Sequence, residues 1–199
     1  MDYGDNHPPQ NLLRSTQYNI MASRSRARSG TFFLRKVQDT NGGTLATSSI
    51  DVSSFVNVLE GELLRVKQIW WDWTSDNGGP VLGADVGGAT KGSSAQASIS
   101  SESRTTVGSL ENNSVLAKNT LFASTNSNTQ IDFITDRTSV NPKDFDDGFL
   151  VATDAVHLNV NQSAEGFSNN VRVCIMMECE IVKLSLSDAQ AVLVSQTVG

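Results

Sequence analysis

The feature that most constrains the fold is a long alternation of side chains between residues 171 and 184. Apolar side chains occupy every second position there: Val171, Val173, Ile175, Met177, Cys179 and Ile181. A period of two puts successive side chains on opposite faces of a β-strand, whereas a helix repeats every 3.6 residues. With Arg172, Glu178 and Glu180 on the other face, the pattern predicts a strand that meets the core on one side and water or another subunit on the other.

The composition also favours strands over helices. Hydrophobic residues are 38% and charged residues 18% of the 199 residues, and Ser, Thr, Asn and Gly fill much of the remainder. Polar turn-forming residues suit short strands joined by turns better than long amphipathic helices. A chain of this length can bury a core without disulfides or metal, so we expect one large domain, or a domain with an arm.

Further strands are predicted between turn signals. The β-rich segments are residues 31–37, 44–50, 62–73, 115–123, 130–135 and 152–160. The Asn-Gly-Gly sequence at 41–43 predicts a tight turn before a return strand. Residues 76–114 are rich in Gly, Ser, Ala and Asn, and we expect a long exposed excursion with short strands near 96–100 and 104–107. Residues 142–148 read as another loop.

About eight strands and almost no helix predict an all-β protein, either a sandwich or a barrel. Eight antiparallel strands in two sheets describe a jelly roll, and we expect residues 30–199 to form one such domain. Near the C-terminus, Ser187 and Gln190 have the spacing of a capping box, which predicts a short helix or turn. The β-branched residues that follow would also fit an added strand.

Three tryptophans lie in the segment 62–73, and the face of each bears on function. Strict alternation puts these residues on the core face: Leu64, Val66 and Trp70. The opposite face would then carry Arg65, Lys67, Ile69, Trp71 and Trp73. Because aromatic residues and arginine concentrate at interfaces, we predict a subunit contact made by Arg65, Lys67, Trp71 and Trp73. A carbohydrate platform on the two outward tryptophans is the second interpretation.

Charge is divided unevenly along the chain. The net charge is −6, yet residues 1–36 hold six basic and two acidic residues, while the rest carries −10. Arg24, Arg26 and Arg28 alternate with small residues and leave no apolar face to bury, so residues 1–29 are predicted to be a flexible basic arm. Together with Arg14 they are the candidate contacts to nucleic acid. Phosphate contacts are individually weak, so the arm would matter mainly in many copies. A solvated tail without function is the alternative.

No constellation of residues indicates catalysis, and we predict that the protein is not an enzyme. His7 and His157 are the two histidines of the chain, too few for the metal centre of a cupin. Neither a nucleophile elbow nor a phosphate-binding loop is present. Cys174 and Cys179 are five residues apart, which puts them on opposite faces of a strand and disfavours a disulfide. No segment is apolar enough to span a membrane, and we expect no secretory signal in the acidic N-terminus.

One acidic cluster could bind an ion. Asp144, Asp146 and Asp147 place three carboxylates within four residues, and Ca²⁺ prefers oxygen ligands on loops. The segment lacks the spacing of an EF-hand, and a solvated acidic turn is the simpler interpretation. Calcium is the single cofactor that the sequence suggests.

The arginine-rich arm with Arg24, Arg26 and Arg28, followed by an eight-stranded sandwich with one long Gly- and Ser-rich excursion, resembles small single jelly-roll viral capsid proteins. The resemblance is architectural and covers the whole chain. It implies a virion protein, made in the host cytoplasm, that assembles in many copies into an icosahedral shell with its arm facing the interior or genome. Other virion proteins would be further partners. The arm is less basic than in many genome-packaging proteins, which weakens the case for direct packaging.

The alternative function is a carbohydrate-binding or adhesive β-sandwich, such as a decoration or fibre-head protein of a virion. That alternative predicts a small oligomer of fixed size. A cupin-type metal enzyme is a third hypothesis, which the scarcity of histidine disfavours.

Overall fold

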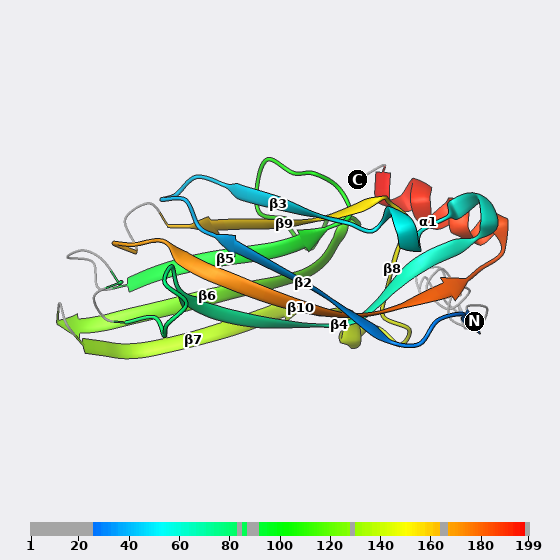
Figure 1. Ribbon diagram of the computed structural model, residues 1–199. Helices are drawn as coiled ribbons and strands as arrows, with labels where there is room; N and C mark the ends of the chain where they lie inside the picture. The colour runs from blue at the N-terminus through cyan, green and yellow to red at the C-terminus, as the bar shows by residue number, and fades with distance from the viewer. Residues whose placement is uncertain (1–25, 83–84, 87–91, 128–129, 164–166, 198–199) are drawn as a thin grey trace, which may run out of the picture.

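The structure, a computed structural model, describes residues 26–82, 85–86, 92–127, 130–163 and 167–197. Strands dominate these residues (Figure 1): β1 (Arg26–Ala27), β2 (Phe32–Asp39), β3 (Ala46–Asp51), β4 (Glu62–Ser75), β5 (Gly92–Ser100), β6 (Val115–Ser127), β7 (Gln130–Val140), β8 (Phe149–Val151), β9 (Ala155–Gln162) and β10 (Val171–Lys183). The helices are short: η1 (Ser53–Phe55), η2 (Val58–Glu60), η3 (Pro142–Asp144) and α1 (Leu186–Thr197). The all-β prediction is confirmed. In the part of the chain that is described, no helix is long and apolar enough to cross a membrane.

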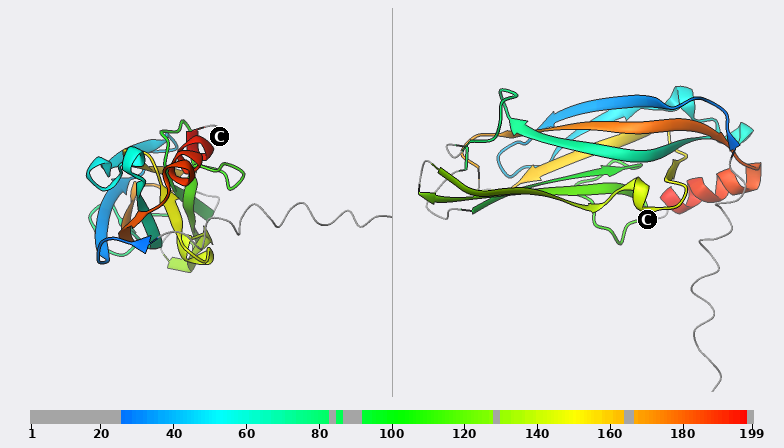
Figure 2. Two further views of the ribbon diagram at one scale, coloured as in Figure 1. Left: turned by 90° about the vertical axis from the view of Figure 1, so that its right-hand side faces the viewer. Right: turned by 90° about the horizontal axis from the view of Figure 1, so that it is seen from below.

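The strands form two antiparallel sheets that pack as two layers (Figure 2). In the first sheet, β10 pairs with β1 and β2 along one edge and with β4 along the other, and β8 lies beyond β4. The second sheet has the order β3-β9-β5-β6-β7. Four pairings are nested along the chain: β2 with β10, β3 with β9, β4 with β8, and β5 with β6. β2 and β10, which are farthest apart in the sequence among these pairs, are therefore neighbours in the sheet. β5 and β6, which are closest in the sequence, form the innermost pair.

Two expectations about connections are wrong. The tight turn at 41–43 does form, with Gly42 and Gly43 at positive φ, but β2 and β3 enter different sheets instead of pairing with each other. The turn therefore joins the two layers. Within the expected excursion, the strand expected near 96–100 does form, but it is longer and largely buried rather than exposed: residues 92–100 form β5 in the middle of the second sheet, and Ala95 and Ala97 are fully buried. The strand is central although its side chains are mostly small, so hydrophobicity in the sequence does not indicate its burial.

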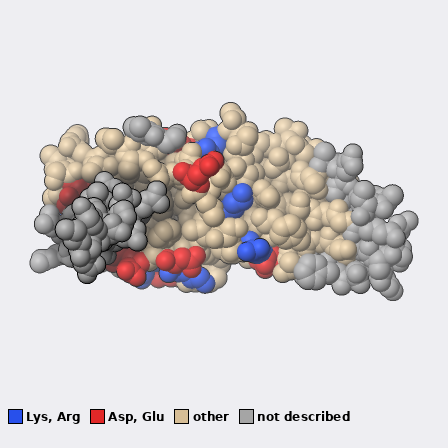
Figure 3. All heavy atoms as spheres, turned by 180° about the vertical axis from the view of Figure 1, so that it is seen from behind, with Lys and Arg blue, Asp and Glu red and all other residues tan. Residues whose placement is uncertain are grey.

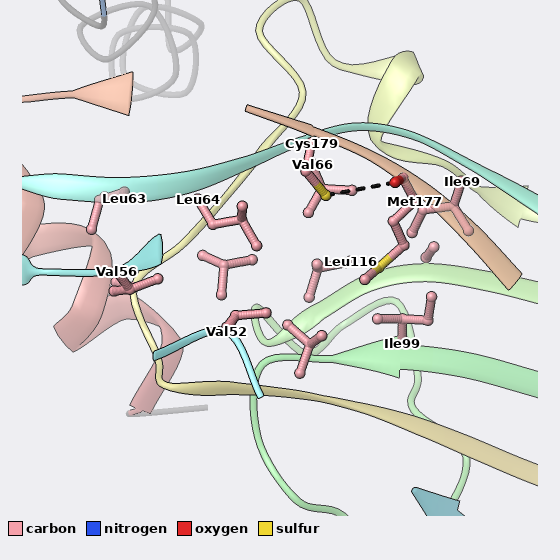
Figure 4. Packing of buried hydrophobic residues seen from close by; sticks show 14 of the residues in the cluster. Val52, Val56, Leu63, Leu64, Val66, Ile69, Ile99, Leu116, Met177 and Cys179 are labelled. Carbon is pink, nitrogen blue, oxygen red and sulfur yellow. Dashed lines mark hydrogen bonds between the residues drawn. The ribbon is translucent and has the colours of Figure 1, made fainter. Parts of the chain in front are cut away.

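The core lies between the sheets and continues beneath α1. Figure 4 shows Leu64, Leu116 and Met177 meeting between the layers, and each is fully buried. Burying a side chain of this size stabilises the fold by about 1.5–3 kcal/mol. Helix α1 closes one end of the core with Ala189 and Val192.

The C-terminal helix is confirmed, although its N-terminal cap lies earlier than expected. Ser185, rather than Ser187, accepts a hydrogen bond from the Asp188 N–H at its Oγ (3.2 Å). Its carbonyl also accepts the Ala189 N–H at 3.0 Å, the first bond of the helix. These bonds satisfy backbone donors that the first turn of a helix leaves without intrahelical partners.

A β-bulge in β4 decides which tryptophans are buried. Lys67 has no partner in β10, since Gln68 pairs with Glu178 and Val66 with Cys179. One extra residue shifts the alternation, so Trp71 and Trp73 pack against the core while Trp70 turns outward and is 38% exposed. The predicted faces are therefore wrong beyond the bulge. Trp70 does not lie in the core, and Trp71 and Trp73 do not share the face of Arg65 and Lys67.

Two residues of the η3 loop hold this irregular part of β4. Gly148 has φ +72°, and a Cβ there would lie 2.4 Å from the Val66 carbonyl oxygen, so glycine is required beside the bulge. The buried Asn141 side chain makes the hydrogen bonds with the Ile69 backbone that a neighbouring strand would otherwise make. Its Oδ1 accepts the Ile69 N–H (3.2 Å), and its Nδ2 donates to the Ile69 carbonyl (2.6 Å).

We predict that Asn141→Ala lowers the free energy of unfolding by about 2–3 kcal/mol, because it leaves the buried N–H and C=O of Ile69 without partners. Urea unfolding followed by tryptophan fluorescence measures this change. The matched control is Asn170→Ala, an exposed amide that accepts the Gly42 N–H (3.3 Å), and its cost should stay within about 0.5 kcal/mol. Equal costs for the two variants would contradict the role of Asn141.

Candidate functional site

The outer face of the first sheet carries an exposed apolar patch, here called the outer strip, formed by Phe33, Val37, Trp70, Cys174 and Met176. Phe33, Val37 and Trp70 are 48%, 50% and 38% exposed. The side chains are neighbours across three strands, because Met176 pairs with Trp70 on β4 and Cys174 pairs with Val37 on β2. The Phe33 and Trp70 rings lie 6.2 Å apart between centroids. Exposed apolar side chains that cluster on one face are typical of an interaction site.

Charged residues border the outer strip in pairs. The ion pairs are Arg65–Glu180 (3.2 Å), Arg65–Asp147 (3.6 Å), Lys67–Glu178 (3.2 Å) and Arg172–Asp39 (2.6 Å). The hydrogen bond to Asp39 is the main reason that the pKa of Arg172 is raised. Because these charges neutralise one another, this face is less repulsive toward a like surface than the net charge of −6 suggests.

Two exposed charges outside these ion pairs lie among the residues of the outer strip, Arg35 between Phe33 and Val37 on β2 and Asp72 two residues after Trp70 on β4. Arg35 on β2 pairs in register with Met176, and Asp72 on β4 pairs with Cys174, so they flank β10 on opposite sides. Neither forms an ion pair within the described part of the chain. Opposite charges on the two sides of one patch can each face a partner of the other sign when two copies meet.

The four residues of the predicted subunit contact do not all lie on one face. Arg65 and Lys67 do lie on the outer face, but Trp71 and Trp73 are packed against the core, and the Trp73 Nε1–H donates to Asn119 Oδ1 of the opposite sheet (2.7 Å). The two tryptophans therefore offer no exposed carbohydrate platform. The residues that the sequence reading missed are Trp70 and Phe33. Alternation within residues 32–38 was a usable signal for Phe33, whereas nothing in the sequence marks the bulge that exposes Trp70.

The basic arm is joined to the first sheet earlier than expected. Arg14 and Arg24 lie outside the described residues. Arg26 of β1 pairs with Lys183 of β10. The backbone N–H of Arg28 donates to the Ile181 carbonyl (2.8 Å), and the Arg28 side chain forms an ion pair with Glu62. In the described part of the chain, the sheet therefore already includes Arg26 and Ala27, ahead of residue 30 and beside the end of β10. Nucleic-acid binding by the four arginines stays a prediction.

The three carboxylates of the acidic loop do not converge. Asp144 caps η3 by accepting the Asn141 N–H at 2.8 Å, and Asp147 pairs with Arg65. Across the described residues no group of three or more Asp, Glu, His or Cys side chains is arranged to hold a metal ion. Calcium binding by Asp144, Asp146 and Asp147 stays a prediction, and this geometry does not favour it.

Comparisons with known proteins identify no family. No protein-family model matches the chain, and a search of curated proteins found no match. The functional proposal therefore rests on the fold and on its surfaces.

The two cysteines provide a chemical test of which face is outward. Burial, with a contribution from Glu178, raises the pKa of Cys179 to about 12, and burial followed by Asp72 raises the pKa of the half-buried Cys174. We expect maleimide to modify Cys174 alone in the native protein, slowly near neutral pH and faster as rising pH forms the thiolate. Mass spectrometry of peptides locates the label. Modification of both cysteines at similar rates before unfolding would refute the assigned faces.

Proposed function

We propose that the protein is a structural virion subunit, made in the host cytoplasm, whose jelly-roll domain assembles in many copies into a closed icosahedral shell. The observation that carries the proposal is the nested pairing of the strands. A jelly roll is an eight-stranded antiparallel hairpin rolled so that its first strand pairs with its last and the pairing continues inward. With β1 and β7 set aside, the eight remaining strands make all four such pairs.

The fold alone does not select a function, since capsid proteins, lectins and cupins all use it. The outer strip favours assembly among these. It presents aromatic and aliphatic side chains inside a border of paired charges, the anatomy of a protein–protein contact. A second copy of the chain suits this surface, because internal pairing of the border charges limits like-charge repulsion and Arg35 and Asp72 supply opposite charges.

A closed shell requires more than one contact surface per subunit, because a single isologous contact ends at a dimer. The α1 end of the domain offers a second apolar region. Leu59 and Val194 there are 82% and 58% exposed, and a hollow of about 480 Å³ lies beside them, lined in part by Val56, Val58 and Leu193. A protruding leucine at a hollow lined by both aliphatic and polar residues is suited to a contact between neighbouring copies.

The arm fits the same proposal. Every copy joins its first sheet at Arg26, so a symmetric shell would gather all the arms on one side. The arginines of the arms would then act at high local concentration on a polyanion, which compensates for the weak binding of each phosphate contact.

The assembly proposal predicts that Phe33→Ser combined with Trp70→Ser blocks shell formation. Each substitution removes apolar area from every copy of the contact, and the loss repeats throughout the assembly. Sedimentation velocity and negative-stain electron microscopy compare the variant with the full-length protein, which should form uniform closed particles. Phe122→Ser, which removes a 42%-exposed phenylalanine from β6 of the second sheet, is the matched control and should still assemble. Monomers or small oligomers of the full-length protein at every salt concentration and pH tested would overturn the proposal.

A second prediction concerns the arm. Deleting residues 2–25 removes Arg14 and Arg24 but leaves the β1 pairing, and it should lower the nucleic-acid content of purified particles, measured from the ratio of absorbance at the nucleic-acid and protein maxima. Deleting residues 2–13 removes no arginine and is the control. Unchanged nucleic-acid content in both variants would show that the arm does not bind the genome.

A further inference from the structure

The outer face of the second sheet holds a cleft of about 740 Å³, on the opposite side of the sandwich from the outer strip. Its wall is the segment 101–114 between β5 and β6, which folds back over the sheet. The Gly108 N–H donates to Ser98 Oγ (2.8 Å), and the Ser101 N–H donates to the Ser114 carbonyl (2.8 Å). Ser98 and Ser114 are fully buried. These bonds hold the wall in place, so the cleft is formed before any ligand arrives.

The chemistry of the lining restricts the class of ligand. None of the described residues that line the cleft is charged, and the polar groups are hydroxyls and carboxamides, including Thr44, Ser94, Gln96, Thr105, Asn161 and Ser163. A phosphate or carboxylate would require arginine or lysine, and a metal ion would require carboxylates, imidazoles or thiolates. An apolar ligand would leave these polar groups without partners. Hydroxyls and carboxamides suit a neutral ligand that both donates and accepts many hydrogen bonds.

Several of these groups are available to a ligand. Among the described residues, the half-buried Gln96 carboxamide has no hydrogen-bond partner. The Asn161 Oδ1 accepts the Gln162 N–H (2.8 Å), which leaves its amide hydrogens free to donate. Leu45 and Val107 add apolar surface to the lining.

An aromatic ring lies on the same face. Phe122 on β6 pairs directly with Ser94 of the cleft and is 42% exposed. Residues that are directly opposite in neighbouring strands present their side chains on one face of the sheet. Figure 3 shows this side of the molecule, where broad areas carry no coloured charged side chain. An exposed ring beside a polar, uncharged cleft can stack on the C–H face of a sugar.

We infer that the cleft binds a neutral carbohydrate. Sugar hydroxyls bond to the Gln96 and Asn161 carboxamides and to the serine and threonine hydroxyls, and one sugar ring lies against Phe122. The site is formed by the second sheet and two adjacent loops, and none of its lining residues belongs to the outer strip. It therefore does not require assembly through the outer strip, and the two proposals can fail separately.

The test is a printed array of neutral glycans, ending in glucose, galactose, mannose, fucose or N-acetylglucosamine, together with sialylated and sulfated glycans. The full-length protein should retain one or more neutral glycans. Gln96→Leu and Phe122→Ser should each weaken the best of them roughly tenfold or more, the size of one lost hydrogen bond or stacking contact. Gln68→Leu, the same change on the first sheet, is the matched control and should leave retention unchanged.

Thermal unfolding of each variant checks that the fold is intact. Gln96→Glu, which keeps the shape but removes the amide donor, provides a second variant if Gln96→Leu is unstable. Retention of no neutral glycan overturns the inference, and so does exclusive retention of sialylated or sulfated glycans. Retention that is unchanged in the Gln96 variants would place the sugar elsewhere and also overturn it.

Discussion

Pairing along both edges of β10 is the constraint on which the rest of the structure depends. This strand pairs with β2 and β1 on one side and with β4 on the other, so it sets the register of three strands at once. The period of two then assigns faces. Val173, Ile175 and Met177 enter the core, while Cys174 and Met176 are left on the outer strip. One alternation in the sequence thus determines both the core and the candidate interface.

The bulge at Lys67 changes the outcome on the neighbouring strand. Before it, Leu64 and Val66 face the core; after it, Trp71 and Trp73 do, and Trp70 is exposed. An extra residue in one strand re-aims every side chain that follows. The aromatic side chain of the outer strip therefore exists because β4 is irregular, and Gly148 and Asn141 in a distant loop stabilise that irregularity.

The two faces of the sandwich have different chemistry, which suits different roles. The first sheet presents an apolar strip bordered by ion pairs, and the second presents an uncharged polar cleft beside Phe122. A surface that assembles and a surface that binds a ligand can coexist on one small domain when they lie on opposite layers. A shell built through the first face would leave the second accessible.

The sequence by itself determined the all-β class, the long alternating strand and the outward position of Cys174, because each follows from local period and composition, whereas it left the C-terminal segment open between a helix or turn and an added strand. It indicated a short strand near 96–100 but not that β5 is longer and lies in the middle of a sheet, and it misassigned the tryptophans. The cleft was also invisible, since residues from β5, β9 and two loops meet there only after folding. Only the tertiary structure decided these features, because a bulge, the order of strands in a sheet and the path of a loop depend on residues far apart in the chain.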